Sequence, residues 1–170
     1  MTIFADHSVP KPAGVPATVG EDPAPADRLR TADIVVMDEA GVPILIAEVK
    51  AQRRLIDVAL RQQLTAYLGA LPSGSFAMLV TPAAIQVFGW NGMVLSEPLC
   101  TLDTSGVLAF YDPEYAHKEV YEMYLTRLVE AWLRDVAYHW KSKTPPAYDE
   151  LRALGITDRL RGGTTLAEAA

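Results

Sequence analysis

The chain has 170 residues, of which 50% are hydrophobic and 21% are charged, and its formal net charge is −6. This length and composition predict one globular domain with a proper core, and the acidic balance argues against a broad nucleic-acid-binding surface of high affinity. No apolar run approaches the ~20 residues that cross a bilayer, and the single cysteine cannot form an internal disulfide. We therefore expect a cytoplasmic protein with no membrane partner.

The first segment, residues 1–28, is rich in proline, alanine, glycine and valine. Its prolines prevent a long helix, because each one removes a backbone donor and clashes with the preceding turn. We expect an extended or disordered arm.

Two apolar runs rich in β-branched residues follow, Ile34–Met37 and Val42–Val49, with a short turn signal at Asp38–Gly41 between them. This pattern predicts an antiparallel hairpin. A turn centred between residues 40 and 41 places Asp33 directly across from Glu48. Lys50 lies two residues beyond Glu48, so its side chain leaves the same face of the strand.

The hairpin therefore gathers two carboxylates and one ammonium group at one point. Two carboxylates about 4 Å apart repel by about 4 kcal/mol at an effective dielectric constant of about 20. A divalent cation removes this repulsion, and hard oxygen ligands suit Mg²⁺ or Mn²⁺. Lys50 beside such an ion would hold or deprotonate an attacking water. The alternative is a cross-strand pair in which Lys50 is the counter-ion and no metal binds, and the spacing alone leaves both open.

Asp33 followed by Glu48-Val49-Lys50 resembles the signature of the PD-(D/E)xK nuclease superfamily. Gln63 and Tyr67 are similar to the Q-x-x-x-Y element of several of its branches, including the nuclease domains of type I restriction enzymes. The resemblance covers about residues 30–90. Two features depart from the pattern: Ala32 stands where the family has proline, and the upstream helix that often supplies another glutamate is not evident.

The resemblance implies a restriction-endonuclease-like core and metal-dependent hydrolysis of phosphodiester bonds in nucleic acid, in DNA rather than RNA. It implies that Asp33, Glu48 and the carbonyl of Val49 bind Mg²⁺ or Mn²⁺. It also implies that Lys50 and Gln63 position the attacking water or the phosphate.

A helix is predicted from about residue 55 to 70, where apolar residues recur at helical spacing. Gln63 and Tyr67 lie four residues apart and project together toward the carboxylates. Arg53, Arg54 and Arg61 are candidates for phosphate contacts and Tyr67 for a substrate contact. A solvated helix face and a half-buried packing tyrosine explain the same residues equally well.

Strands are predicted at residues 76–81 and 85–90, and the Asn91-Gly92 turn predicts that residues 93–95 pair back on the second of them. The helical crossover makes the strand that ends near Lys50 parallel to residues 76–81. These elements predict an α/β fold with a mixed central β-sheet flanked by helices.

The remaining chain is predicted as a short strand at residues 107–111, a long helix at 114–141 that begins near Pro113, and a short helix at 148–154. His139 falls on the apolar side of the long helix, where we expect a packed histidine. Residues 161–170 are expected to be a loose tail. The predicted organisation is an arm (1–28), a nuclease-like α/β domain (29–143), and a short helix with its tail (144–170).

The sequence is compatible with two other functions. The chain could be a binding or assembly module that keeps the nuclease fold without turnover and contacts a protein partner or a second copy. It could also be an unrelated α/β domain in which Asp33 and Glu48 are incidental.

Overall fold

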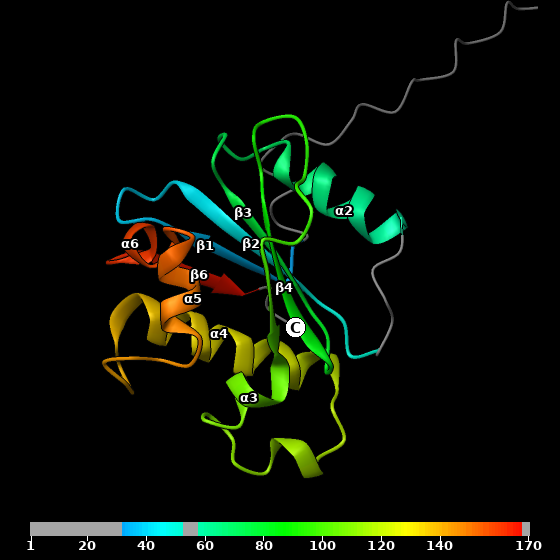
Figure 1. Ribbon diagram of the computed structural model, residues 1–170, viewed down its shortest axis with the longest axis vertical. Helices are drawn as coiled ribbons and strands as arrows, with labels where there is room; N and C mark the ends of the chain where they lie inside the picture. Colours follow the sequence, from blue (N-terminus) through cyan, green and yellow to red (C-terminus); the bar gives the residue numbers. More distant parts are fainter. Residues whose placement is uncertain (1–31, 53–57, 168–170) are drawn as a thin grey trace, which may run out of the picture.

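A six-stranded mixed sheet with helices on both faces forms the centre of the computed structural model, which describes residues 32–52 and 58–167 (Figure 1). The predicted α/β class is confirmed. The strands are β1 (Ile34–Met37), β2 (Pro43–Val49), β3 (Phe76–Val80), β4 (Ala84–Gly89), β5 (Cys100–Asp103) and β6 (Thr164–Ala167). The helices are α2 (Val58–Leu68), α3 (Thr104–Leu108), α4 (Glu122–Tyr138), α5 (Tyr148–Ala153) and α6 (Ile156–Leu160), with a 3-10 turn at Tyr115–His117.

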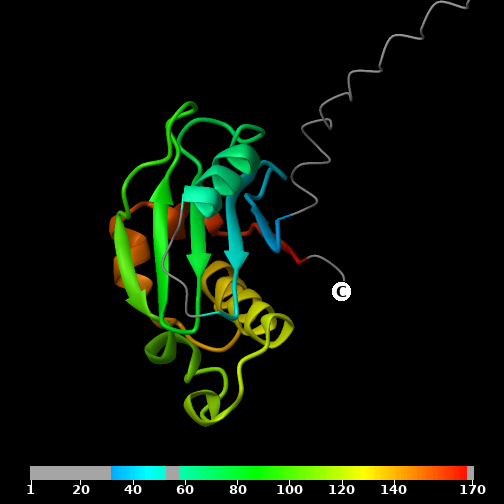
Figure 2. The same ribbon diagram turned by 90° about the vertical axis from the view of Figure 1, so that its right-hand side faces the viewer.

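The sheet separates two apolar layers, because side chains alternate between its faces. Ile34 and Val36 join the larger layer with α3, α4, α5 and α6, where Trp132 of α4 is fully buried. Val35 joins the smaller layer, in which Leu64 and Leu68 of α2 are fully buried. The views in Figures 1 and 2 show α2 and α4 covering different parts of the sheet. None of the helices in the described ranges has the length and apolar character needed to cross a membrane.

The sheet order is β5-β4-β3-β2-β1-β6. The predicted hairpin is confirmed with its register, because Ile34 pairs with Ala47 and Val35 pairs with Ile46 in antiparallel β1 and β2. The Asp38 carboxylate closes the turn by accepting hydrogen bonds from the backbone N–H groups of Ala40 and Val42, both at 2.9 Å. Strands β2 and β3 are parallel, as the helical crossover predicts.

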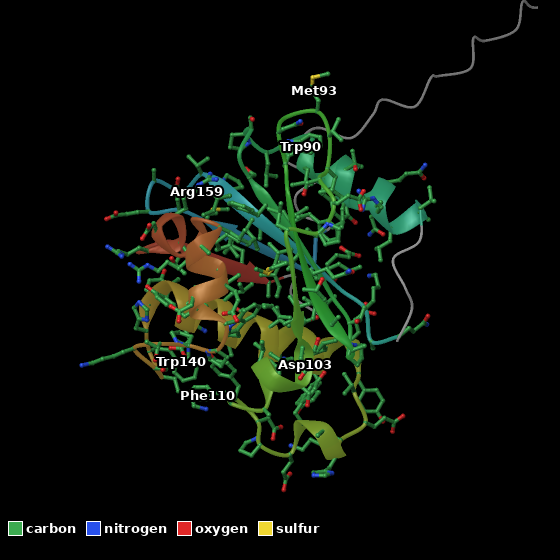
Figure 3. All side chains as sticks on the ribbon, viewed as in Figure 1. Trp90, Met93, Asp103, Phe110, Trp140 and Arg159 are labelled. Atoms are coloured by element: carbon green, nitrogen blue, oxygen red, sulfur yellow. The ribbon has the colours of Figure 1, made fainter. Side chains whose placement is uncertain are left out.

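The strand predicted at residues 93–95 is wrong. The turn is present, since Gly92 has a φ of +95°, but only an isolated bridge joins Trp90 to Leu95. The Asn91 side-chain oxygen accepts the N–H groups of Met93 and Val94 at 2.9 and 2.7 Å, which takes those donors away from a return strand. Met93 is 83% exposed at the tip of this loop (Figure 3). The second neighbour of β4 is β5 instead.

The short strand predicted at residues 107–111 is also wrong, because helix α3 occupies this region. Asp103 (Figure 3) is its N-cap, and its carboxylate accepts the backbone N–H of Gly106 at 2.6 Å. An aspartate followed by threonine and serine is a typical helix start, and here that local signal outweighs the β-branched character of Val107.

The long helix begins later than predicted, at Glu122 rather than near Pro113. The Asp112 carboxylate accepts hydrogen bonds from Lys118 Nζ and from the Tyr124 hydroxyl, both at 2.6 Å, and so holds the preceding segment as a separate loop. These hydrogen bonds lower the pKa of Asp112 to about 2. His139 is not the packed histidine that was expected: it is exposed and ends α4 in the left-handed conformation, with a φ of +52°.

The loose tail expected from residue 161 is wrong as well. Thr164–Ala167 forms β6 and pairs antiparallel with β1, with Ala167 opposite Ile34. Gly163 makes this pairing possible, because a Cβ atom there would lie 2.0 Å from the carbonyl oxygen of Met37. The predicted arm at residues 1–28 lies outside the described residues.

Asp135 is a fully buried carboxylate that holds the end of α4. It accepts hydrogen bonds from the Tyr111 hydroxyl at 2.8 Å and from the backbone N–H groups of Lys141 and Ser142 at 2.8 and 3.1 Å. Burial and this hydrogen bond both raise the pKa of Tyr111. Phe110 and Trp140, which flank this network in the chain, lie on the same side of the molecule (Figure 3).

We predict that Asp135→Ala lowers the free energy of unfolding by about 3 kcal/mol, because three donors lose their acceptor at one buried point. Urea denaturation followed by circular dichroism measures the change. Glu39→Ala, an exposed carboxylate in the hairpin turn, is the control and is expected to stay within about 0.5 kcal/mol of the parent chain. Equal effects of the two substitutions would contradict this account.

Candidate active site

The predicted carboxylates meet at the end of the sheet where β1 begins and β2 ends. Asp33 immediately precedes β1, Glu48 lies in β2, and Lys50 follows it. The confirmed hairpin register places Asp33 opposite Glu48, on the face that α2 covers. The Lys50 Nζ atom lies 2.6 Å from Glu48 Oε1 and 4.0 Å from Asp33 Oδ2. The three groups are therefore gathered on one face, as the hairpin register predicts.

The Glu48 carboxylate is 2% exposed, and its two oxygens differ in their surroundings. Oε1 accepts hydrogen bonds from Lys50 Nζ at 2.6 Å and from Gln63 Nε2 at 2.9 Å. Oε2 is buried and has no hydrogen-bond donor among the described residues. A buried, charged oxygen without a donor is costly, so this atom marks a place where a cation or a further donor would bind favourably.

Asp33 is held by the strand that it faces. Its Oδ2 atom accepts the backbone N–H of Val49 at 2.7 Å, and the side chain is 20% exposed. The Val49 side chain is buried in the larger core layer, so only the backbone of this residue can serve the site. The hydrogen bond fixes the Asp33 carboxylate beside Lys50.

Gln63 connects α2 to the site and explains how Glu48 is oriented. Its Nε2 atom donates to Glu48 Oε1 and also to the hydroxyl of Tyr67, at 2.7 Å. Tyr67 is partly buried and packs against the smaller core layer. Within this structure Gln63 is a positioning residue for Glu48, and Tyr67 supports Gln63 from the next turn of the helix.

Arg61 is turned toward a different part of the molecule from Gln63. Its guanidinium donates to the carbonyl of Ser96 at 3.0 Å, lies 3.3 Å from the Glu97 carboxylate, and covers the ring of Phe88 at 5.7 Å. Through Ser96 and Glu97, these contacts connect α2 to the loop between β4 and β5. Arg53 and Arg54, the other predicted phosphate contacts, lie outside the described residues.

Glu122 is a site residue that sequence reasoning missed. It lies in the first turn of α4, 53% exposed, and its Oε1 atom is 4.0 Å from Lys50 Nζ. An acidic residue in the first turn of a helix is a recognisable signal in a sequence. The helix was predicted to begin at residue 114, however, so Glu122 was expected in its middle rather than at its start. Only the path of α4 around the end of the sheet brings it to Lys50.

Among the described residues, the cluster brings together the carboxylates of Asp33, Glu48 and Glu122 around the Lys50 ammonium. Burial, and next the charge of Asp33, raise the pKa of Glu48 against the opposing effects of Lys50 and Gln63. Burial lowers the pKa of Lys50, but the hydrogen bond to Glu48 and the charges of Glu48, Asp33 and Glu122 outweigh it and raise this pKa. Glu48 thus binds a proton more readily than an ordinary glutamate, and Lys50 keeps its proton to a higher pH than an ordinary lysine.

The site offers a partial set of hard oxygen ligands rather than a complete metal-binding group of side chains. Across residues 32–52 and 58–167, no group of three or more His, Cys, Asp or Glu side chains is arranged to hold a metal ion. Mg²⁺ commonly binds through one or two carboxylates and retains several waters, and Asp33, Glu48 and the Val49 carbonyl can supply that number of oxygens. The unpartnered Glu48 Oε2 is the observation that favours such an ion here.

Comparisons with protein-family models, with curated proteins and with solved structures find no match for this chain. The interpretation of the site therefore depends on its own geometry.

We predict that the free energy of unfolding falls as the pH rises from 4.5, the ordinary pKa of a glutamate side chain, through the raised pKa of Glu48. In this window the folded state binds more protons than the unfolded state, so a rise in pH favours unfolding. Urea denaturation at a series of pH values measures the effect. Glu48→Gln removes the titrating group, and its unfolding free energy should lack this decline relative to the parent. Parallel pH profiles for the two proteins would contradict the prediction.

Proposed function

We propose that this protein is a metal-dependent phosphodiesterase that hydrolyses nucleic acid, with DNA as its substrate. The observation that carries the proposal is the buried Glu48 carboxylate, which keeps one oxygen without a donor while Asp33 and Lys50 lie beside it. Acidic oxygens that can hold a metal ion, with a lysine beside them, can supply the electrostatic stabilisation that phosphodiester hydrolysis uses.

In this proposal Asp33, Glu48 and the Val49 carbonyl hold Mg²⁺ or Mn²⁺. The bound ion would supply charge stabilisation to the phosphate as negative charge develops on it. Lys50 would donate hydrogen bonds to the attacking water or to a phosphate oxygen, and its positive charge would favour the same transition state. Gln63 keeps the Glu48 carboxylate in place through the hydrogen bond described above.

The arrangement of the elements supports a restriction-endonuclease-like core. Strand β2 ends at the candidate residues, α2 crosses the sheet, and β3 returns parallel to β2. The family resemblance suggests a further glutamate from an upstream helix, and α4 brings Glu122 to the site from downstream in the chain. Helix α4 also packs against β6, the strand that completes the sheet beside β1.

We predict that the protein with Mg²⁺ or Mn²⁺ cleaves at least one of plasmid DNA, single-stranded DNA and RNA. Lys50→Ala, Asp33→Asn and Glu48→Gln should each lower the rate by about 100-fold or more, because each removes a group that acts in the transition state. Gel analysis of the products over time measures the rates. Chelation of the metal should abolish cleavage.

Lys143→Ala is the lysine control for Lys50→Ala. Lys143 is exposed and lies between α4 and α5. Cleavage by this variant should equal that of the parent. Loss of activity in both lysine variants would point to charge or contamination rather than to the site, and cleavage that survives Lys50→Ala would overturn the proposal.

Glu122→Gln tests the carboxylate that α4 supplies. We predict a rise in the metal concentration needed for half-maximal cleavage by about fivefold, with a smaller change in the maximal rate. The effect is modest because Glu122 is 53% exposed and its charge is partly screened by solvent. Glu119→Gln, three residues earlier in the chain, is the control. Identical metal titrations for the Glu122→Gln variant and the parent would remove Glu122 from the site.

A further inference from the structure

We infer that the Lys50 ammonium and a divalent metal ion compete for the Glu48 carboxylate, so that metal binding on Oε2 displaces Lys50 from Oε1. The inference rests on the metal site of the proposed function. It assigns Lys50 a second role in addition to its contact with water or phosphate: it is the protein's own counter-ion for the site.

Lys50 lies among three carboxylates. Its Nζ atom lies 2.6 Å from Glu48 Oε1, 4.0 Å from Asp33 Oδ2 and 4.0 Å from Glu122 Oε1. Three carboxylates from three parts of the chain therefore surround one ammonium group. The three carboxylates together attract a cation strongly at the position of the Lys50 Nζ atom. A divalent ion bound nearby would repel the ammonium group.

The two oxygens of the Glu48 carboxylate have different partners. Lys50 and Gln63 both use Oε1, while the buried Oε2 has no donor among the described residues. The ammonium therefore neutralises the carboxylate incompletely, and one oxygen remains for a stronger ligand. A divalent ion on Oε2 would reduce the attraction that holds Lys50, because the charge of the carboxylate would then be balanced.

The Lys50 side chain has access to solvent and can leave the Glu48 carboxylate. The side chain is 34% exposed, whereas Glu48 is 2% exposed, so the ammonium can reach solvent while the carboxylate stays in place. A lysine head group is strongly hydrated and its stem is flexible, which makes this exchange accessible. The released ammonium would lie at the edge of the site, where a phosphate oxygen would accept its hydrogen bonds.

The test is the affinity for Mn²⁺ alone, measured by isothermal titration calorimetry on the parent and on Lys50→Met. Methionine keeps an unbranched stem but removes the competing charge. We expect Lys50→Met to bind Mn²⁺ about tenfold more tightly than the parent does, which corresponds to about 1.4 kcal/mol. It should also melt at a lower temperature than the parent without the metal and show the larger rise in melting temperature with it.

Two further variants separate charge from packing. Lys50→Arg keeps the positive charge and should bind Mn²⁺ no more tightly than the parent does. Lys143→Met removes an exposed lysine between α4 and α5 and should leave the affinity unchanged. Melting curves show whether each variant is folded.

The outcomes distinguish this inference from the proposed function. Tighter binding by Lys50→Met alone supports the exchange. Equal or weaker binding by Lys50→Met, with clear binding by the parent, overturns the exchange and leaves the metal-dependent function standing. Absence of Mn²⁺ binding in both proteins overturns the two together.

Discussion

The antiparallel pairing of β1 with β2 is the constraint on which the candidate site depends. A slip of one residue would send Asp33 to the opposite face of the sheet, away from Glu48 and Lys50. The core prevents such a slip, because side chains on both faces of β1, among them Ile34 and Val35, are buried. Pairing with β6 on the other side fixes β1 further. The geometry of three charged groups is thus set by apolar packing that extends far beyond them.

Two buried carboxylates show how a structural acid differs from the candidate functional one. Asp135 is fully buried and receives hydrogen bonds from a tyrosine hydroxyl and two backbone N–H groups, so its charge is well compensated. Glu48 is almost as buried, but its donors both use one oxygen and leave the other without a partner among the described residues. Burial alone therefore does not identify a site. Incomplete compensation beside a second acid and a lysine is the more specific indication.

Much of the hairpin and its charged cluster could be predicted from the sequence, because the apolar runs, the short turn and the alternation of side chains are local properties. The crossover to β3 also followed from element order.

The long-range features could not be predicted. The pairing of β6 with β1 depends on Gly163, which lies against the carbonyl group of Met37, and the sequence gives no sign of this contact. The loop before α4 depends on Asp112 hydrogen bonds to Lys118 and Tyr124, and without that loop Glu122 could not be recognised as a neighbour of Lys50. At Asn91 and Asp103, side-chain hydrogen bonds to the backbone outweighed strand propensity.

The position of β6 has a consequence for how the protein is made. Strand β1 lies between β2, which follows it directly in the chain, and β6, which is translated after all the other strands of the sheet. The hairpin and its charged groups are therefore translated well before the strand that pairs with the other edge of β1. Within the described residues, β1 gains its second neighbour only when β6 has been made.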